Sequence, residues 1–167
     1  MFGDRRIGLC RRLRRLTYTL DLLMLQQNPN VAVWQTADEY LGAAEILLNY
    51  NRLRPAAILA ALSLELCLKC FLARRIAPWT ATTSRGHSLV SLFNEISLDD
   101  RKALLKTSIT LDSSIDFEKY IERFDRHFEN GRYLHEPDAL NPIGSDIVYF
   151  ARHVHSAVHE MAKQRNV

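Results

Sequence analysis

The stretch from Pro55 to Arg75, PAAILAALSLELCLKCFLARR, is apolar over nearly its whole length and has no glycine or proline after its first residue. This run of good helix formers predicts an α-helix of about five turns, buried on most of its circumference. It is nearly long enough to cross a bilayer, but the charges of Glu65 and Lys69 near its middle would be costly there. We therefore expect the central helix of a soluble core and no membrane span.

The charged residues of this helix form a narrow polar break. Glu65 precedes Lys69 by four residues, the order that favours an ion pair on one helix face, which contributes a few tenths of a kcal/mol. Ser63 is the only other polar residue before the terminal arginines. We expect the Glu65 and Lys69 stripe to be exposed or to face a partner.

Charge is distributed unevenly along the 167 residues. The first 30 residues carry six arginines and two aspartates, a net charge of +4, which leaves −1 of the total +3 for residues 31–167. With 47% apolar and 25% charged residues, the whole chain has a composition typical of one globular domain. Its nearly neutral body lacks the broad basic surface of a constitutive nucleic-acid binder.

The arginine-rich start is set apart from the body by Gln26 to Asn30. We divide the chain into a basic extension, 1–30, and a helical domain, 31–167. The extension could be a basic amphipathic helix that contacts nucleic acid or a membrane surface, a transit-like segment, a disordered tail, or a mis-assigned start, since Met24 could itself begin the chain.

The cysteines and histidines predict no metal site and no cofactor. Cys10, Cys67 and Cys70 are too few for a disulfide framework, which favours a reducing cytoplasm. Cys67 and Cys70 have metal-ligand spacing, but both fall inside an apolar helix and no second pair lies nearby. The histidines from position 127 onward match no zinc-protease spacing; they are His127, His135, His153, His155 and His159.

Helical periodicity continues on both sides of the central helix. Thr36 and Glu39 match a capping box for a first helix that ends near Tyr50, and the short link Asn51 to Arg54 predicts an antiparallel hairpin. The segment Ile76 to Arg85 is expected to be a loop. No segment alternates with period two for long enough to predict a strand.

The remaining helices are indicated by their caps and apolar stripes. One begins after Gly86-His87-Ser88, where the imidazole of His87 is expected to bind a backbone or carboxylate group in a capping role. A short one runs from Ser97 and Asp100 to about Lys106. An aromatic stripe runs from Phe117 to Phe128 and ends at Gly131, and a final helix begins at Ser145 or Asp146. The fold class is therefore all-α, a bundle of four or five helices.

Four pieces in order resemble the HEPN domain family. They are LELCLKCFLARR, then GHSL at a helix start, then an aromatic helix leading into GRYLHEP, then a closing helix with arginine and histidine. HEPN domains are all-α bundles found in prokaryotic toxins, in CRISPR-associated nucleases and beside nucleotidyltransferases. The resemblance covers about Val33 to Gln164 and excludes the basic start.

The final helix contains the arginine and histidine that the family's ribonucleases carry. Arg152 and His159 are separated by six residues, the upper limit of that pattern, and the resemblance assigns them as catalytic. Independently, at 100° per residue they lie within about 20° of each other on the border of the apolar stripe. His155 lies between them and the core face, and His153 points away.

Other residues are accessory or structural candidates. The resemblance makes Arg132 and Tyr133 the family's frequent RY element, with the ring of Tyr133 buried and Arg132 paired to an acid such as Glu65. Met161 stands where the family's modified-toxin variant has a tyrosine two residues after the histidine. This departure argues against inactivation by a nucleotidyltransferase at that position.

Three functions remain open from the sequence. The first is a metal-independent endoribonuclease of toxin type, a homodimer restrained by an antitoxin, because an Arg/His pair suffices for RNA cleavage. The second is a non-catalytic HEPN module that binds a nucleotidyltransferase, another protein or a nucleotide. The third is an adaptor whose basic arm contacts RNA, DNA or anionic lipid.

Overall fold

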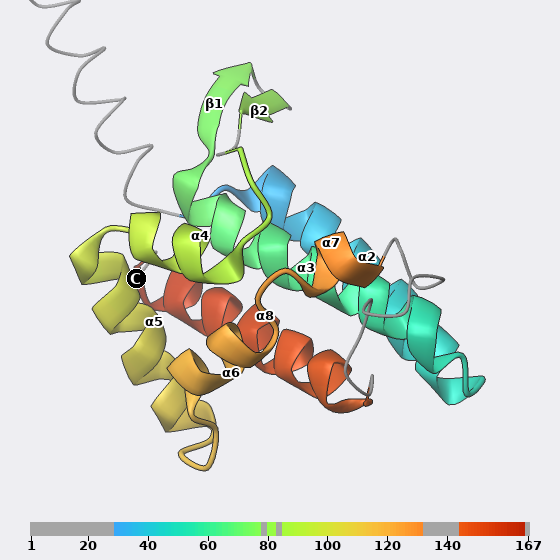
Figure 1. Ribbon diagram of the computed structural model, residues 1–167. Coiled ribbons are helices and arrows are strands. Elements are labelled where there is room, and N and C mark those ends of the chain that lie inside the picture. The colour runs from blue at the N-terminus through green and yellow to red at the C-terminus, as the bar shows by residue number, and fades with distance from the viewer. Residues whose placement is uncertain (1–28, 78–79, 83–84, 132–143, 166–167) are drawn as a thin grey trace, which may run out of the picture.

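The computed structural model describes residues 29–77, 80–82, 85–131 and 144–165 and confirms the all-α fold class (Figure 1). Four longer helices form the body of the bundle: α2 (Val31–Asn49), α3 (Leu53–Leu72), α5 (Leu98–Leu111) and α8 (Asp146–Arg165). Three short helices complete it: α4 (Leu89–Glu95), α6 (Phe117–Arg123) and α7 (His127–Gly131). The segment Arg132 to Tyr133, with its predicted RY element, lies outside the described residues.

Helix α3 occupies the centre, as its apolar sequence predicts. It packs against α2, α4, α7 and α8 (Figure 1). Leu64 and Leu68 are fully buried, and the buried hydroxyl of Ser63 donates to the carbonyl oxygen of Ala37 at 2.8 Å. Among the described residues, α3 is long and apolar enough to cross a membrane, but 61% of its most apolar window is buried inside the bundle, as in the core helix of a soluble protein.

The polar stripe of α3 is buried, so the expectation of an exposed stripe is wrong. Glu65 is 3% exposed and Lys69 is 7% exposed. Lys69 Nζ donates to Glu65 Oε1 at 2.6 Å, and Nδ1 of His87 lies 2.9 Å from Glu65 Oε2. Because a carboxylate only accepts, Nδ1 of His87 carries the proton of this bond. Glu65, Lys69 and His87 thus form a largely buried polar cluster, in which His87 comes from the segment before α4.

The α2–α3 hairpin forms as predicted, but α2 begins earlier than the capping box indicates. Asn30 is the N-cap, and its Oδ1 accepts from the backbone N–H of Val33 at 3.2 Å. Thr36 lies inside the helix, where its hydroxyl donates to the carbonyl of Ala32 at 3.0 Å. The turn between the helices includes Asn51 with φ of 57°, a conformation that asparagine tolerates.

Part of the segment predicted as a loop after α3 forms two short strands. β1 (Arg74–Ala77) pairs antiparallel with β2 (Thr80–Thr82), with Arg74 opposite Thr82. They project from the helical body in Figure 1. The chain then returns to the bundle, and Ser88 caps α4 by accepting from the N–H of Ser91 at 3.1 Å. The predicted start of α4 is therefore confirmed, with Ser88 and not His87 as the cap.

Two further helices differ in extent from the prediction. Ser97 caps α5 as expected, but α5 continues to Leu111, and its buried Ser108 contacts His153 of α8. The aromatic stripe is divided into α6, which ends at Arg123, and α7, which begins at His127. Arg126, with a φ of 59°, lies in the turn between them. Phe124 nevertheless stays buried, with its ring 5.9 Å from that of Phe150 on α8.

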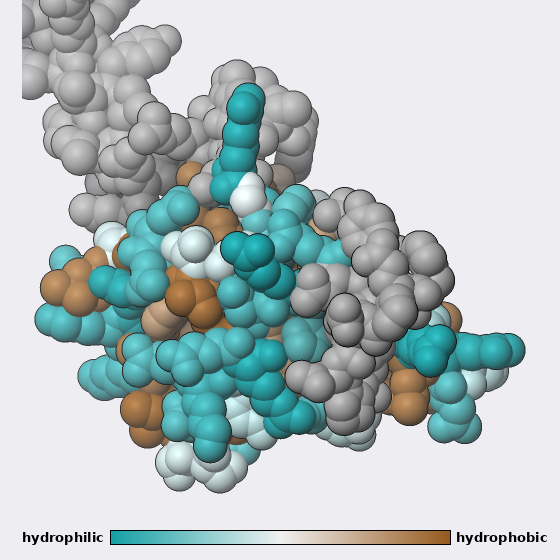
Figure 2. Space-filling model, viewed as in Figure 1, coloured by the Kyte–Doolittle hydropathy of each residue, from teal (hydrophilic) through white to brown (hydrophobic). Residues whose placement is uncertain are grey.

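The face of the molecule shown in Figure 2 is mostly hydrophilic, and its apolar side chains form small separate patches. Large exposed apolar side chains occur on several elements rather than on one. They are Val31, Ile46, Tyr50, Leu53, Leu98, Ile109, Leu111 and Tyr149.

Candidate functional site

The predicted catalytic residues lie on α8 along its seam with α2. Trp34, near the start of α2, contacts the rings of His155 and His159, whereas Glu45, near the end of α2, pairs with Arg152. A residue early in α2 thus contacts residues late in α8, and a residue late in α2 contacts one early in α8. The two helices therefore run antiparallel here. The seam therefore carries side chains from both helices in one row.

Arg152 is half exposed and held from α2. Its Nε donates to Oε1 of Glu45 at 2.6 Å, and its Cζ lies 5.8 Å from the ring centroid of Tyr149. The side chain of Arg152 is 52% exposed and that of Glu45 is 32% exposed, so the pair contributes at most about 1 kcal/mol to stability. Its effect on the orientation of the guanidinium is the more important consequence.

His159 is also about half exposed, and it stacks on an aromatic ring. Its imidazole lies 5.3 Å from the ring centroid of Trp34, with an angle of 12° between the planes. Its Nδ1 is 3.8 Å from Oε1 of Glu160. Seven residues separate Arg152 from His159, which places them about 10 Å apart along the helix axis. They share one flank, two turns apart.

His155 lies between these two residues in the sequence and is largely covered. It stacks on Trp34 with ring centroids 4.5 Å apart, and its side chain is 14% exposed. Its Nε2 is 3.2 Å from Oδ1 of Asp38, without hydrogen-bond alignment. Burial lowers the pKa of His155, and the nearby Asp38 carboxylate partly opposes that shift. His155 is thus a covered ring beside the exposed His159.

His153 lies elsewhere on α8. Its Nε2 is 2.7 Å from the hydroxyl of Ser108 on α5. Ser108 is fully buried. Burial lowers the pKa of His153 as well. The structure therefore brings Arg152, His155 and His159 to the α2 seam and directs His153 toward α5. Val148 is buried, so the exposed residue beside Arg152 is Tyr149.

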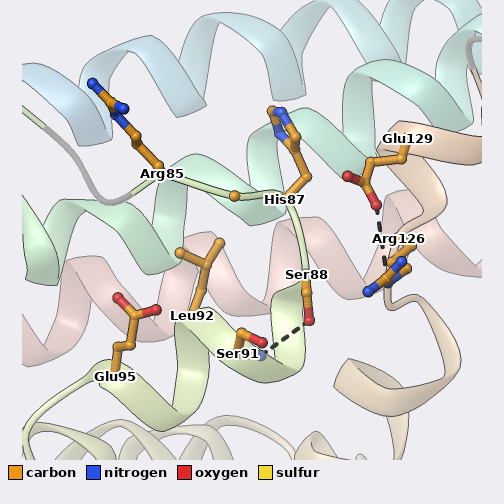
Figure 3. Close-up of a pocket in the computed structure, with 9 residues that line it drawn as sticks. Arg85, His87, Ser88, Ser91, Leu92, Glu95, Arg126 and Glu129 are labelled. Carbon is orange, nitrogen blue, oxygen red and sulfur yellow. Dashed lines mark hydrogen bonds and ion pairs between the residues drawn. The ribbon is translucent and has the colours of Figure 1, made fainter.

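Glu65 and Lys69 belong to a different part of the molecule, where His87 links Glu65 to a polar hollow. The hollow measures about 300 Å³ and is lined by the segment before α4, by α4 itself, and by Arg126 and Glu129 (Figure 3). Arg126 and Glu129 form a loose ion pair at 4.0 Å across its rim. Two arginines and two glutamates line it, so its charge selects neither anions nor cations.

The two described cysteines are core residues. Cys70 Sγ donates to the carbonyl oxygen of Cys67 at 2.9 Å, and both side chains are buried. Burial raises the pKa of the Cys67 thiol to about 12 and raises that of Cys70 as well. Both therefore remain protonated, unlike the thiolates that bind metals. Within the described ranges, no group of three or more His, Cys, Asp or Glu residues is placed to hold a metal ion.

Sequence reasoning missed the residues that α2 contributes. Trp34, Asp38 and Glu45 are spaced by four and seven residues, so they fall on one helix face beside the buried Ala37 and Leu41. That spacing was readable in the sequence. His87 was singled out, but its carboxylate partner on α3 was not.

Comparison with known families supports the resemblance seen in the sequence. No curated protein and no solved structure matches the chain. The HEPN domain family matches residues 31–161, close to the expected Val33 to Gln164 and most of the chain. This match agrees with the helical bundle described above. The chain therefore belongs to the HEPN domain family.

Proposed function

We propose that this protein is a metal-independent endoribonuclease of toxin type, a cytoplasmic homodimer in which Arg152 and His159 are the catalytic residues. The observation that carries the proposal is that both side chains stand about half exposed on one flank of α8. Both are therefore accessible to a phosphodiester. HEPN domains are often ribonucleases or nucleotide-binding modules, which agrees with this assignment.

The chemistry follows from the two side chains. His159 removes the proton from a 2′-hydroxyl, the 2′-oxygen forms a bond to phosphorus, and the bond from phosphorus to the 5′-oxygen breaks. A second imidazole, the partner subunit's His159, returns a proton to that leaving oxygen. Arg152 donates to the phosphate oxygens as negative charge develops on them. The products are a 2′,3′-cyclic phosphate and a free 5′-hydroxyl.

The need for both a base and an acid favours a dimer. In a two-fold contact between copies of α8, residues at the axis face their own counterparts, and residues away from it face a different residue of the other copy. An axis that crosses α8 near His159 brings the two His159 side chains together, with an Arg152 to either side. HEPN domains often dimerise and work with partners, and the exposed Tyr149 supplies an apolar contact beside Arg152.

The test is cleavage of a short RNA by the wild type and by Arg152→Ala, His159→Ala and the double variant. We expect activity in excess EDTA, losses of about 10² to 10⁴-fold in each single variant, and little further loss in the double variant. Lys106→Ala, which removes an exposed cation from α5, is the matched control and should stay near wild type. Equal cleavage of a 2′-deoxy substrate would exclude the 2′-hydroxyl route.

Dimerisation is tested separately by sedimentation. A 19.3 kDa monomer at micromolar concentration counts against the proposed ribonuclease. Release of growth arrest by His159→Ala during expression supports toxin action, and an antitoxin is then sought as the partner that abolishes the arrest.

A non-catalytic HEPN module is the second candidate function, and one observation favours it. Glu45 already occupies Nε of Arg152, which reduces the positive charge that a phosphate meets at the flank. Such a module binds a nucleotidyltransferase or another protein. It is supported if purified protein cleaves no RNA and His159→Ala leaves complex formation with the partner intact.

A further inference from the structure

Helix α2 contacts both candidate catalytic side chains of α8 at once. Glu45 accepts from Nε of Arg152, and Trp34 stacks against the ring of His159. These contacts join residues more than 100 positions apart in the sequence. The two α8 side chains are exposed and long or rotatable, so without such contacts each would sample several rotamers.

The indole of Trp34 is a fixed surface for an imidazole. Trp34 is partly buried and packs against the core, and its plane lies within 12° of the His159 ring and 19° of the His155 ring. A parallel stack of this kind restricts rotation of the exposed imidazole about its side-chain bonds. The face of an indole also attracts a cationic ring at this distance. Other titratable groups near the stack are Asp38 and Glu160.

Glu45 has the corresponding effect on Arg152. Its carboxylate accepts from Nε, so the other edge of the guanidinium, formed by its terminal nitrogens, is the edge available for a phosphate. The ring of Tyr149 lies against the same guanidinium. Arg152 is therefore held on two sides, and its direction is set before any substrate arrives.

We infer that α2 is the positioning element of the proposed ribonuclease site, with Trp34 fixing the ring of His159 and Glu45 fixing the guanidinium of Arg152. The inference rests on the proposed function and adds two residues to it. Trp34 and Glu45 are positioning residues, because they act through His159 and Arg152. Misplacement of a catalytic group by about 1 Å can lower a rate by about 10²-fold.

Trp34 is tested with two substitutions. Trp34→Phe retains a flat ring and should keep kcat within about threefold, whereas Trp34→Leu should lower kcat by about 10 to 10²-fold with little change in KM. Tyr50→Leu, which removes an exposed aromatic ring just after α2, is the control and should not change kcat. Melting temperatures separate a rate effect from unfolding.

Glu45 is tested by comparing an isosteric and a truncating substitution. Glu45→Gln keeps an oxygen that accepts from Nε and should retain most of kcat, whereas Glu45→Ala should lower kcat at least tenfold. Glu39→Ala removes an exposed carboxylate from the same helix and serves as the control. If both Glu45 variants instead raise kcat/KM, Glu45 masks Arg152 from substrate and the positioning inference is wrong.

A readout without activity separates this inference from the proposed function. In a Trp79→Phe background Trp34 is the remaining tryptophan, and His159→Ala should change its fluorescence whereas Lys106→Ala should not. Unchanged emission in His159→Ala refutes the stack itself. If the wild type cleaves no RNA, the proposed function fails and the inference fails with it. If the wild type cleaves RNA and both Trp34→Leu and Glu45→Ala match its kcat, the positioning inference alone fails.

Discussion

Glu65→Ala should be strongly destabilising, because it leaves the ammonium group of Lys69 buried without its carboxylate partner. Glu65 and Lys69 are 3% and 7% exposed, and their side chains meet at 2.6 Å. Removing one member of a buried ion pair costs about 3 to 5 kcal/mol. An exposed pair with the same spacing contributes only about 0.2 to 0.5 kcal/mol. The two environments therefore differ about tenfold in the expected loss.

This loss is measurable against a total stability of about 5 to 15 kcal/mol. For a domain of this size each kcal/mol lowers the melting temperature by about 2 to 4 °C, so Glu65→Ala should melt about 6 to 20 °C lower. Urea unfolding followed by circular dichroism at the helical band gives the free energy directly. Comparable slopes against urea show that the compactness of the unfolded state is unchanged.

Three further variants make the interpretation specific. Replacing both partners, Glu65→Leu with Lys69→Met, should recover most of the loss, since a buried ion pair can be exchanged for apolar side chains of similar size. His87→Ala removes a hydrogen bond from a side chain that is 35% exposed, so it should cost less than Glu65→Ala. Glu39→Ala should change stability by about 0.5 kcal/mol or less. A loss this small in Glu65→Ala would refute the buried cluster.

Two other predictions follow from the pKa shifts. Burial lowers the pKa of His127, His153 and His155 in the folded state, so the unfolded chain binds more protons as the pH falls below about 6.5. The free energy of unfolding should therefore decrease from about pH 7 to pH 5, and His153→Gln should flatten that decrease in urea titrations. Because their thiols are buried and protonated, Cys67 and Cys70 should react with a thiol reagent at pH 8 only in denaturant, as mass spectrometry of labelled protein will reveal.

The helical core could be predicted because apolar residues that recur at the helical period mark the face of a helix that is buried. The continuous apolar run of α3 placed Leu64 at the centre of the bundle, where it is fully buried. Ala151 and Val154, three residues apart on α8, fall on one helix face, and both are buried. These predictions need only the period of the helix and a sequence in which no glycine or proline interrupts it.

Contacts between distant segments could not be predicted from spacing. Thr36 and Glu39 have the sequence of a cap, but the cap forms at Asn30, whose backbone N–H also donates to the carbonyl of Cys70 at 2.8 Å. Glu65 and Lys69 have the spacing of a surface pair, yet His87 and the helices that follow it cover them. In each case a residue far along the chain decided the outcome.

The candidate site illustrates the same limit and has a consequence for function. Periodicity alone placed Arg152 and His159 on one flank of α8, but only the packing of α2 against α8 places Glu45 and Trp34 beside them. Trp34 and Glu45 lie at the border of the buried face of α2. A polar or aromatic residue at such a border can also simply face solvent, so the sequence alone did not single these two out. The orientation of both α8 side chains therefore depends on the docking of the α2–α3 hairpin. A substitution that loosens this docking, even one far from the flank, should reduce the proposed RNA cleavage before it unfolds the domain.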